Sequence, residues 1–226
     1  EPMPAPLTRT WQAKGVPIRQ GFGMTEVGVN CFSLPEADAV RKMGSIGFPN
    51  LFVDIRIVDA NGRDVTPGET GELVFRGPVV TPGYWRNPEA TRKAFTADGW
   101  FRSGDLVRQD DEGYVYVVGR LKEMYISGGE NVYPAEVEAV LREHPAVAEA
   151  AVVGVPDDRW GEAGVAFLVP AGPAPDAAAL VDFCRQRLAA YKVPREIRWL
   201  DALPVGHSGK IQKTDLVALA TTAPAS

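Results

Sequence analysis

The alternation of hydrophobic and polar residues in the first half of the chain predicts a series of strands. Apolar side chains occupy every second position at 53–57, which is the period of a strand with one buried face. Residues 72–76, which include Leu73 and Phe75, are predicted to be a second strand of this kind. Asn61-Gly62 lies between these segments and is a signal for a hairpin turn. A further apolar strand is predicted at 114–118. We interpret these strands as the framework of a small distorted barrel.

Shorter signals complete the first half of the chain. Residues 7–20 predict a short helix followed by a strand that ends at Ile18. Asn87 and Pro88 are residue types that begin helices. Residues 99–105 predict a tight turn, with another strand immediately after it.

The second half follows a different pattern, in the order strand, helix, strand, strand, helix, strand. Gly128-Gly129 predicts a turn that uses positive φ angles. Pro134 stands where a helix would begin. Residues 147–155 and 165–169 are nearly continuous apolar strands. Helices and strands in this order indicate a compact unit of roughly 100 residues, which is within the normal size of a domain.

The predicted fold class is α+β, with two domains. A second helix capped by Asp176 and an extended segment at 196–200 complete the second half. The predicted domains are residues 1–119 and 123–226, joined by a hinge at 120–122.

Composition limits the possible classes of function. The 226 residues are 45% hydrophobic and carry a net charge of −5, which is typical of soluble globular proteins and gives no electrostatic help in binding nucleic acid or an anionic membrane. No apolar run approaches the roughly 20 residues of a transmembrane segment, and the first residues do not form a signal peptide. Cys31 and Cys184 follow no metal-binding pattern, so we expect reduced thiols in a cytoplasmic protein.

Residues 119–138, GRLKEMYISGGENVYPAEVE, carry a family resemblance. They resemble the domain junction of the adenylate-forming enzymes: acyl- and aryl-CoA ligases, luciferases and the adenylation domains of peptide synthetases. The ISGGENVYPAEVE form is most similar to bacterial fatty-acyl-CoA and aryl-CoA ligases. The resemblance implies that residues 1–119 end the large AMP-binding domain, with its distorted β-barrel subdomain. Residues 123–226 would then be the small, mobile C-terminal lid.

The chain also lacks two features of a complete enzyme of this kind. It does not begin with Met, and it contains no Ser/Thr/Gly-rich loop of the type that wraps the ATP phosphates in the family. We therefore expect this chain to be the C-terminal portion of a longer enzyme. The missing N-terminal part of the same enzyme would be one of its partners. The other partners implied are a small carboxylic acid, ATP and CoA.

The segment QGFGMTE is similar to a nucleotide-binding motif of the family. The resemblance implies that Gly21 and Gly23 let the backbone approach ATP or AMP, with Phe22 packing beside the adenine. Phe22 stands where most relatives have Tyr, so stacking is kept and a phenolic hydrogen bond is lost. Thr25 would face the phosphate, and Glu26 would help to hold Mg²⁺, which prefers oxygen ligands. Taken alone, the heptapeptide is equally compatible with a glycine-containing turn and a solvated glutamate.

Asp105 and Arg120 are the other residues that the resemblance assigns to the nucleotide. A carboxylate can accept two hydrogen bonds from a ribose diol, and Asp105 has this role by resemblance. Arg120 would lie near the ribose and phosphates. The alternatives are that Asp105 caps the turn before the next strand and that Arg120 is a surface residue.

Three places in the second half resemble CoA-binding segments of the family. Gly128-Gly129 would lie along the pantetheine arm, and Trp160 would stack on the CoA adenine. Tyr191 and Arg195 belong to a segment, YKVPR, that contacts CoA in the same enzymes.

The YKVPR segment departs from one relative, which has Arg where this chain has Val193. Phosphate contacts would then come from Lys192 or Arg195. For most of the basic residues in this region we favour the alternative, a solvated face.

Lys210 is the predicted catalytic lysine. It lies in LPVGHSGKIQK, a glycine-rich segment that matches the Pro-x-x-x-x-Gly-Lys segment of the family. By resemblance, the ammonium contacts the carboxylate substrate and the α-phosphate, where a compact positive charge stabilises developing negative charge. Lys122 would be the pivot on which the lid rotates between the two half-reactions.

The function predicted from these residues is an ATP-dependent acid–CoA ligase. The carboxylate attacks the α-phosphorus of Mg·ATP, and CoA then displaces AMP from the acyl-adenylate. One alternative is an adenylating enzyme that passes its acyl group to a carrier protein or to oxygen. Another is a non-catalytic fragment that only binds CoA or a nucleotide, because this chain by itself lacks the phosphate loop and is expected to be inactive alone.

Overall fold

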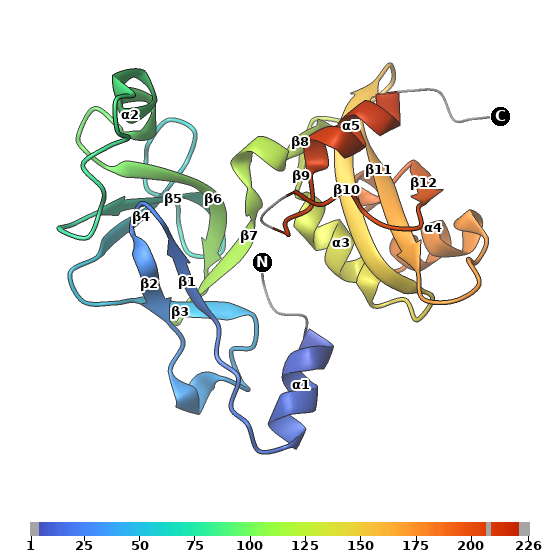
Figure 1. The fold of residues 1–226 in the computed structure, drawn as a ribbon, viewed down its shortest axis with the longest axis horizontal. Coiled ribbons are helices and arrows are strands. Elements are labelled where there is room, and N and C mark those ends of the chain that lie inside the picture. The colour runs from blue at the N-terminus through green and yellow to red at the C-terminus, as the bar shows by residue number, and fades with distance from the viewer. Residues whose placement is uncertain (1–4, 207–208, 222–226) are drawn as a thin grey trace. The chain divides into compact units, whose positions relative to one another are not determined.

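The computed structural model describes residues 5–206 and 209–221 and divides the chain into two compact units. The units are Glu1–Leu121 and Lys122–Ser226, and Figure 1 shows the elements of each. The division falls inside the segment 120–122 in which the sequence predicts a hinge. Each hydrophobic core cluster of buried side chains lies wholly within one unit. Among the described residues, no helix combines the length and the apolar character needed to cross a membrane.

The first unit is built on a seven-stranded antiparallel sheet. The strand order is β1-β2-β3-β7-β6-β5-β4. The strands are β1 (Gly21–Met24), β2 (Gly28–Ser33), β3 (Ser45–Pro49), β4 (Asp54–Val58), β5 (Thr70–Arg76), β6 (Phe101–Gln109) and β7 (Val115–Arg120). The helical segments are α1 (Ala5–Ala13), the 3-10 turn η1 (Glu36–Asp38) and α2 (Pro88–Ala94).

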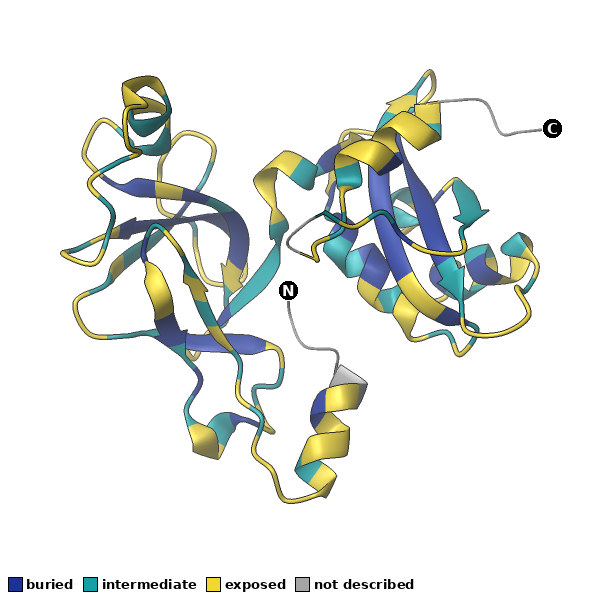
Figure 2. Cartoon of the chain, viewed as in Figure 1, coloured by how far each residue is buried: buried dark blue, intermediate teal, exposed yellow. Residues whose placement is uncertain are grey.

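The α+β class is confirmed, but the sheet of the first unit is open rather than a closed barrel. Its edge strands β1 and β4 do not pair with each other in the part of the chain that the structure describes. The main core of this unit combines aliphatic side chains with three fully buried aromatic ones, Phe32, Phe75 and Phe101. Figure 2 shows the buried positions along β3, β5 and β6. α2 begins as predicted, because the side chain of Asn87 accepts a hydrogen bond from the backbone N–H of Ala90 at 3.0 Å.

Two local predictions for the first unit are wrong. Residues 16–20 form no strand: Pro17 has no backbone N–H to donate, most of the segment is exposed, and the first strand begins only at Gly21. Asp105 does not follow a tight turn, because β6 runs continuously through it. The irregularity there is a bulge in the pairing of β5 with β6, with Gly104 at a φ of 70°.

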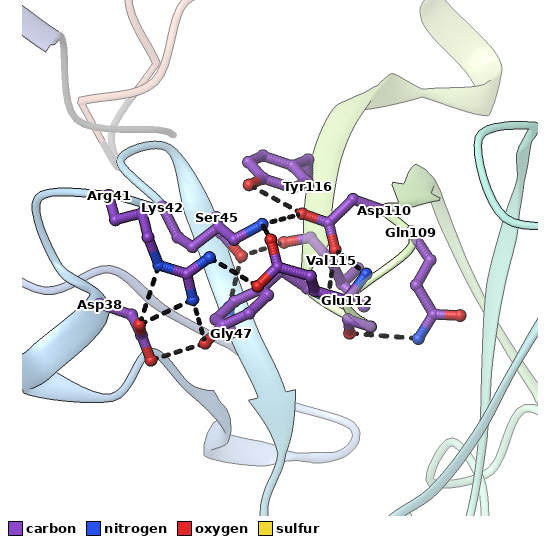
Figure 3. A network of polar contacts seen from close by, with 12 residues as sticks. Asp38, Arg41, Lys42, Ser45, Gly47, Gln109, Asp110, Glu112, Val115 and Tyr116 are labelled. Atoms are coloured by element: carbon purple, nitrogen blue, oxygen red, sulfur yellow. Dashed lines mark hydrogen bonds and ion pairs between the residues drawn. The ribbon is translucent and has the colours of Figure 1, made fainter.

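A polar network joins the η1 region to the hairpin between β6 and β7 (Figure 3). Lys42 Nζ lies 2.7 Å from Asp110 Oδ2 and 2.6 Å from Glu112 Oε1. Arg41 pairs with Asp38 and Glu112, and the hydroxyl of Tyr114 donates to Asp38 at 2.6 Å. These contacts span about seventy residues of sequence and fix the hairpin whose strands carry Asp105 and Arg120.

The second unit is a five-stranded sheet with helices on both faces. β11 pairs antiparallel with β10 on one side and lies against β8 and, in parallel, β12 on the other. The strands are β8 (Tyr125–Ser127), β9 (Glu130–Val132), β10 (Val147–Asp157), β11 (Gly161–Pro170) and β12 (Glu196–Trp199). The helical segments are η2 (Leu121–Glu123), α3 (Pro134–Arg142), α4 (Ala177–Arg185), η3 (Ala190–Lys192) and α5 (Lys213–Thr221).

Alternation along β10 separates two cores. Ala150 and Val152 belong to the cluster that also contains the buried residues of α3 and α4. Ala151 and Val153 belong to the cluster that contains Leu216 of α5. Successive side chains of a strand point to opposite faces, so α5 covers the face of the sheet opposite to α3 and α4, as Figure 1 shows.

The sequence correctly predicted most elements of this unit but missed α5. Pro134 opens α3, Asp176 caps α4, and Gly128 and Gly129 have φ angles of 61° and 88°. α5 is held at its C-terminal end by Arg198 of β12, whose guanidinium donates to the backbone carbonyls of the last turn.

Candidate functional site

The glycines of QGFGMTE lie in β1 and pack against their own sheet. A Cβ placed on Gly23 would collide with the backbone of Val29 in β2, and one on Gly21 would lie 2.8 Å from the side chain of Asn30. The heptapeptide is therefore a strand followed by a turn, and the close approach that Gly23 permits is to β2. Phe22 is half-buried and stacks on Phe75 with ring centroids 6.2 Å apart.

Thr25 and Glu26 form the turn after β1, where Thr25 is exposed and Glu26 is half-buried. The hydroxyl of Tyr84 donates to Oε1 of Glu26 at 3.0 Å. The backbone N–H of Thr81 donates to the Glu26 carbonyl at 2.7 Å. Residues 81–84 therefore position the Glu26 carboxylate. In the described segments, no three His, Cys, Asp or Glu side chains form a metal-binding cluster.

Asp105 and Arg120 lie directly opposite each other on β6 and β7. Arg120 Nε is 2.7 Å from Asp105 Oδ1, and the Asp105 carboxylate is buried while the Arg120 side chain is 45% exposed. The structure thus brings together the two residues that the sequence assigned to the ribose. The guanidinium of Arg120, which is the more exposed partner, thus occupies one hydrogen-bonding position of the Asp105 carboxylate.

Cys31, in β2, contacts the β1 segment. Its thiol donates to the backbone carbonyl of Phe22 at 3.3 Å. Burial raises the pKa of Cys31 to about 11, and the negative charge of Asp105 adds to this rise. Cys31 is therefore a neutral thiol that is hydrogen-bonded to the Phe22 segment.

In the second unit, Gly128 lies against the indole of Trp160. A Cβ on Gly128 would lie 2.7 Å from Cε3 of that ring, whereas a Cβ on Gly129 would meet no atom. The N–H of Gly128 also donates to the carbonyl of Trp160 at 2.9 Å. The turn between β8 and β9 and the turn between β10 and β11 are thus packed together, and Gly128 is what allows it.

Trp160 is flanked by cations. The guanidinium of Arg195 lies 4.8 Å from the ring centroid and that of Arg159 lies 5.1 Å from it. Asp157 accepts hydrogen bonds from the backbone N–H groups of Arg159 and Trp160, which fixes the turn. The indole nitrogen of Trp160 is buried, and no described residue accepts a hydrogen bond from it.

The remaining residues of the YKVPR segment have structural partners. Lys192 Nζ lies 2.7 Å and 2.8 Å from the two carboxylate oxygens of Glu136 in α3. Tyr191 packs against the core beneath α3 and α4. Arg195 is less tightly paired, because it is 42% exposed and lies 4.0 Å from Asp157.

Lys210 lies on the loop before α5. Two residues of this loop, His207 and Ser208, are outside the described residues. The N–H of Gly206 donates to the Lys210 carbonyl at 2.9 Å, and the N–H of Gln212 donates to the Pro204 carbonyl at 2.8 Å. Lys210 is exposed, and none of the acidic side chains that the structure describes forms an ion pair with it. Lys210 is thus an exposed lysine whose backbone carbonyl is hydrogen-bonded to Gly206.

Sequence reasoning missed the residues that support these side chains. Tyr84 lies in Gly83-Tyr84-Trp85, between the predicted strand at 72–76 and the predicted helix start at Asn87 and Pro88. Asp157 and Lys213 are near the predicted residues in sequence, but nothing in their local pattern reveals their partners. Only the folded chain shows which side chain each of them contacts.

Two family models match the chain. The model of the AMP-binding enzyme matches residues 1–85, and that of the AMP-binding enzyme C-terminal domain matches residues 136–210. The two matches fall in the two units of the structure.

Curated relatives and solved structures agree with these matches. A feruloyl-CoA synthase from Amycolatopsis sp is 48% identical over 216 residues, which are 95% of this chain and 44% of the relative. The o-succinylbenzoate CoA synthetase from Bacillus subtilis with its acyl-adenylate intermediate has a TM-score of 0.89 and 40% identity, over 99% of this chain and 45% of that one. The same synthetase with ATP and magnesium ion has a TM-score of 0.88 and 40% identity, over 95% and 44%. The chain spans less than half the length of each.

Proposed function

Since the chain belongs to the AMP-binding enzymes, we propose that it is the C-terminal part of an ATP-dependent acid–CoA ligase. The relatives are named as CoA synthases and ligases, which supports CoA as the acceptor. The reaction would join a carboxylic acid to AMP with release of pyrophosphate, and the CoA thiolate would then displace AMP. A cytoplasmic location fits the two free, buried thiols, Cys31 and Cys184.

The nucleotide would bind along the sheet of the first unit. Phe22 offers a partly exposed ring for the adenine, and Asp105 with Arg120 offers a carboxylate and a guanidinium for the ribose and phosphates. Arg120 would move from Asp105 Oδ1 to the nucleotide as the diol replaces it. This exchange would move only a side chain, because Arg120 is the last residue of β7 and its side chain is 45% exposed.

The residues present fit a magnesium ion that is shared with ATP. Mg²⁺ in such sites takes one or two protein carboxylates and completes its shell with phosphates and water. Glu26 would supply one carboxylate oxygen, while Tyr84 holds the other through its hydroxyl. Bound Mg²⁺ would neutralise phosphate charge.

The turn at Gly128 and Gly129 fits the CoA that the proposal requires. Gly129 leaves open space above the turn, where a narrow chain such as pantetheine could lie. Arg195 beside Trp160 supplies positive charge for a phosphate. The buried indole N–H of Trp160 has no acceptor among the described residues, so a small movement of the turn would offer it to a ligand.

The observation that carries the proposal is that the second unit has two different chemical features on separate segments. The Lys210 loop adjoins α5 and the face of the sheet that α5 covers. The Gly128 turn lies against the β10–β11 turn. A domain with both features could serve adenylation with Lys210 and thioester formation with Gly128-Gly129.

The test measures both half-reactions of the full-length enzyme with Lys210→Ala. Loss of one positioned donor to developing charge costs roughly 10²–10³ in rate, so adenylation should fall by that factor. Thioester formation from supplied acyl-adenylate should stay nearly normal. Lys93→Ala is the control, because Lys93 is an exposed lysine of α2 paired with Glu89. Equal loss of both half-reactions at an unchanged melting temperature would overturn the assignment of Lys210.

A further inference from the structure

Lys213 is a largely buried lysine that holds two carboxylates from distant parts of the second unit. Its Nζ lies 2.8 Å from Oε2 of Glu123 and 2.8 Å from Oε1 of Glu138. The Glu138 oxygen also accepts a hydrogen bond from the backbone N–H of Val152 at 2.8 Å. Burial by itself would lower the pKa of Lys213, but Glu138 and Glu123 together raise it above the ordinary lysine value. The lysine is therefore charged and locked between the two glutamates.

The position of these residues in the chain gives the network its significance. Glu123 ends η2 and directly follows Lys122, the predicted pivot. Glu138 is buried in α3 against the sheet. Lys213 is the first residue of α5 and follows the Lys210 loop. One ammonium thus ties the start of the unit, its sheet and the end of the loop together.

The loop is closed where Lys213 holds it. Gln212, the residue before Lys213, donates its backbone N–H to the carbonyl of Pro204, and Val205 pairs with Ile211 in an isolated bridge. Leu216, one turn into α5, is fully buried. The described ends of the Lys210 loop are thus bonded to each other, and the C-terminal end adjoins the ion pairs of Lys213.

We propose that Lys213 is a positioning residue, which through Glu123 and Glu138 holds the Lys210 loop in a fixed place relative to the turn that follows the hinge. The proposal rests on the proposed function, because it gives Lys213 a role in adenylation. An apolar side chain could fill the same space, but it would leave the buried Glu138 carboxylate without its cation. An apolar side chain could not form ion pairs with these two particular carboxylates. Rotation of the unit about the hinge would then carry Lys210 as part of one rigid body.

The first test is amide hydrogen exchange on the 226-residue chain and does not depend on activity. In Lys213→Met, the amides of Gly206 and Gln212 should exchange roughly tenfold faster or more, while that of Phe167 in β11 keeps its protection. Lys213→Arg, which keeps the charge, should restore protection. Arg187→Met is the control, because it removes a cation of the same unit that lies 3.9 Å from Glu143 and is 39% exposed.

The second test measures the half-reactions of the full-length enzyme with the same variants. Misplacement of a catalytic group by about 1 Å can cost up to roughly 10²-fold in rate, so Lys213→Met should slow adenylation within that range and leave thioester formation unchanged. If Lys213→Met does not fold, Glu123→Gln, which releases only the arm toward the hinge, should give smaller effects of the same kind.

The outcomes separate this proposal from the proposed function. Unchanged exchange at Gly206 and Gln212 would overturn the positioning role, whatever the enzyme does. Faster exchange with normal adenylation would also overturn it, because the loop would then be loosened without consequence. If Lys213→Met exchanges faster but the wild-type full-length enzyme forms no adenylate, the anchoring is real and the proposed function is wrong.

Discussion

The phenol of Tyr125 lies between two glycines of neighbouring strands. A Cβ on Gly154 of β10 or on its partner Gly164 of β11 would collide with the tyrosine side chain. The ring is 2% exposed, and its hydroxyl is buried with no hydrogen-bond partner among the described residues. Desolvation raises the pKa of Tyr125 well above its usual value. The ring of Tyr125 stabilises the fold by apolar packing, while burial of its hydroxyl lowers the free energy of unfolding.

Tyr125→Phe is therefore expected to be neutral or stabilising. A buried polar group without a partner costs about 1–3 kcal/mol, so the free energy of unfolding should stay equal or rise by about 1 kcal/mol. The measurement is urea unfolding followed by circular dichroism. Tyr114→Phe is the matched control, because the Tyr114 hydroxyl donates to Asp38, and that variant should lose stability. A clear loss in Tyr125→Phe would mean that its hydroxyl has a partner in solution.

At the scale of elements, the residues that a turn requires depend on the neighbour against which the turn packs. Gly128 and Gly129 both have positive φ angles in the turn between β8 and β9. Only Gly128 lies against another side chain, the indole of Trp160. Two adjacent glycines with the same local signal therefore have different functions in the fold.

Gly128→Ala and Gly129→Ala should differ in kind. Each places a Cβ in the left-handed region, which costs about 1–2 kcal/mol. Gly128→Ala must also displace Trp160, so it should lose more stability and change the near-ultraviolet circular dichroism of the tryptophans. Gly129→Ala should leave that spectrum unchanged. Identical spectra for the two variants would contradict the contact between Gly128 and Trp160.

The η1 region and the β6–β7 hairpin are joined by charges, so their association should depend on pH. Hydrogen bonds from Tyr114 and Arg41 lower the pKa of Asp38, and those from Lys42 and Arg41 lower the pKa of Glu112. A carboxyl whose pKa is lower in the folded state stabilises the fold above its unfolded pKa of about 4. That contribution is lost as the pH falls through the lowered folded pKa.

Glu112→Gln should reduce stability near pH 7 and have little effect near pH 2, relative to the wild type. Unfolding by urea across this range measures the difference. The Glu112 side chain is 54% exposed, so about 1 M salt should also shrink the effect by screening. Glu89→Gln, in an exposed pair on α2, is the control. A destabilisation by Glu112→Gln that is independent of pH would exclude this electrostatic origin.

At the scale of the whole molecule, the chain is two separately cored units. The clusters around Phe32 and Trp100 lie in Glu1–Leu121, and those around Leu141 and Leu216 lie in Lys122–Ser226. Burial of apolar surface is the main favourable term in folding. Each unit therefore contains its own source of stability.

Residues 122–226 expressed alone should fold and unfold cooperatively. The urea midpoint of this fragment should match that of the same unit in the 226-residue chain. In both proteins, hydrogen exchange of amides in β10 and β11 measures the unfolding of the unit. Residues 1–121 expressed alone provide the comparison. A fragment 122–226 without a cooperative transition would show that its two cores are insufficient and that the units depend on each other.

Much of this fold was predictable because the relevant signals are local. The cap at Asn87, the proline that opens α3 and the glycines at 128 and 129 act within a few residues of themselves. The apolar runs of β10 and β11 are likewise continuous in sequence. The resemblance added the candidate residues. Among these, Asp105 and Arg120 lie opposite each other on β6 and β7, and Gly128 contacts Trp160 in the second unit.

By itself, the sequence determined the type of most elements, the α+β class and the residues that resemble a nucleotide and CoA site. Only the tertiary structure decided that the first sheet stays open, that Asp105 is buried beneath Arg120 and that Lys213 joins Glu123 to Glu138. The physical reason is that each of these depends on pairing between residues that are far apart in the chain. Strand order, register and ion-pair partners are selected by the packing of the whole unit, and no local period of hydrophobicity contains that information.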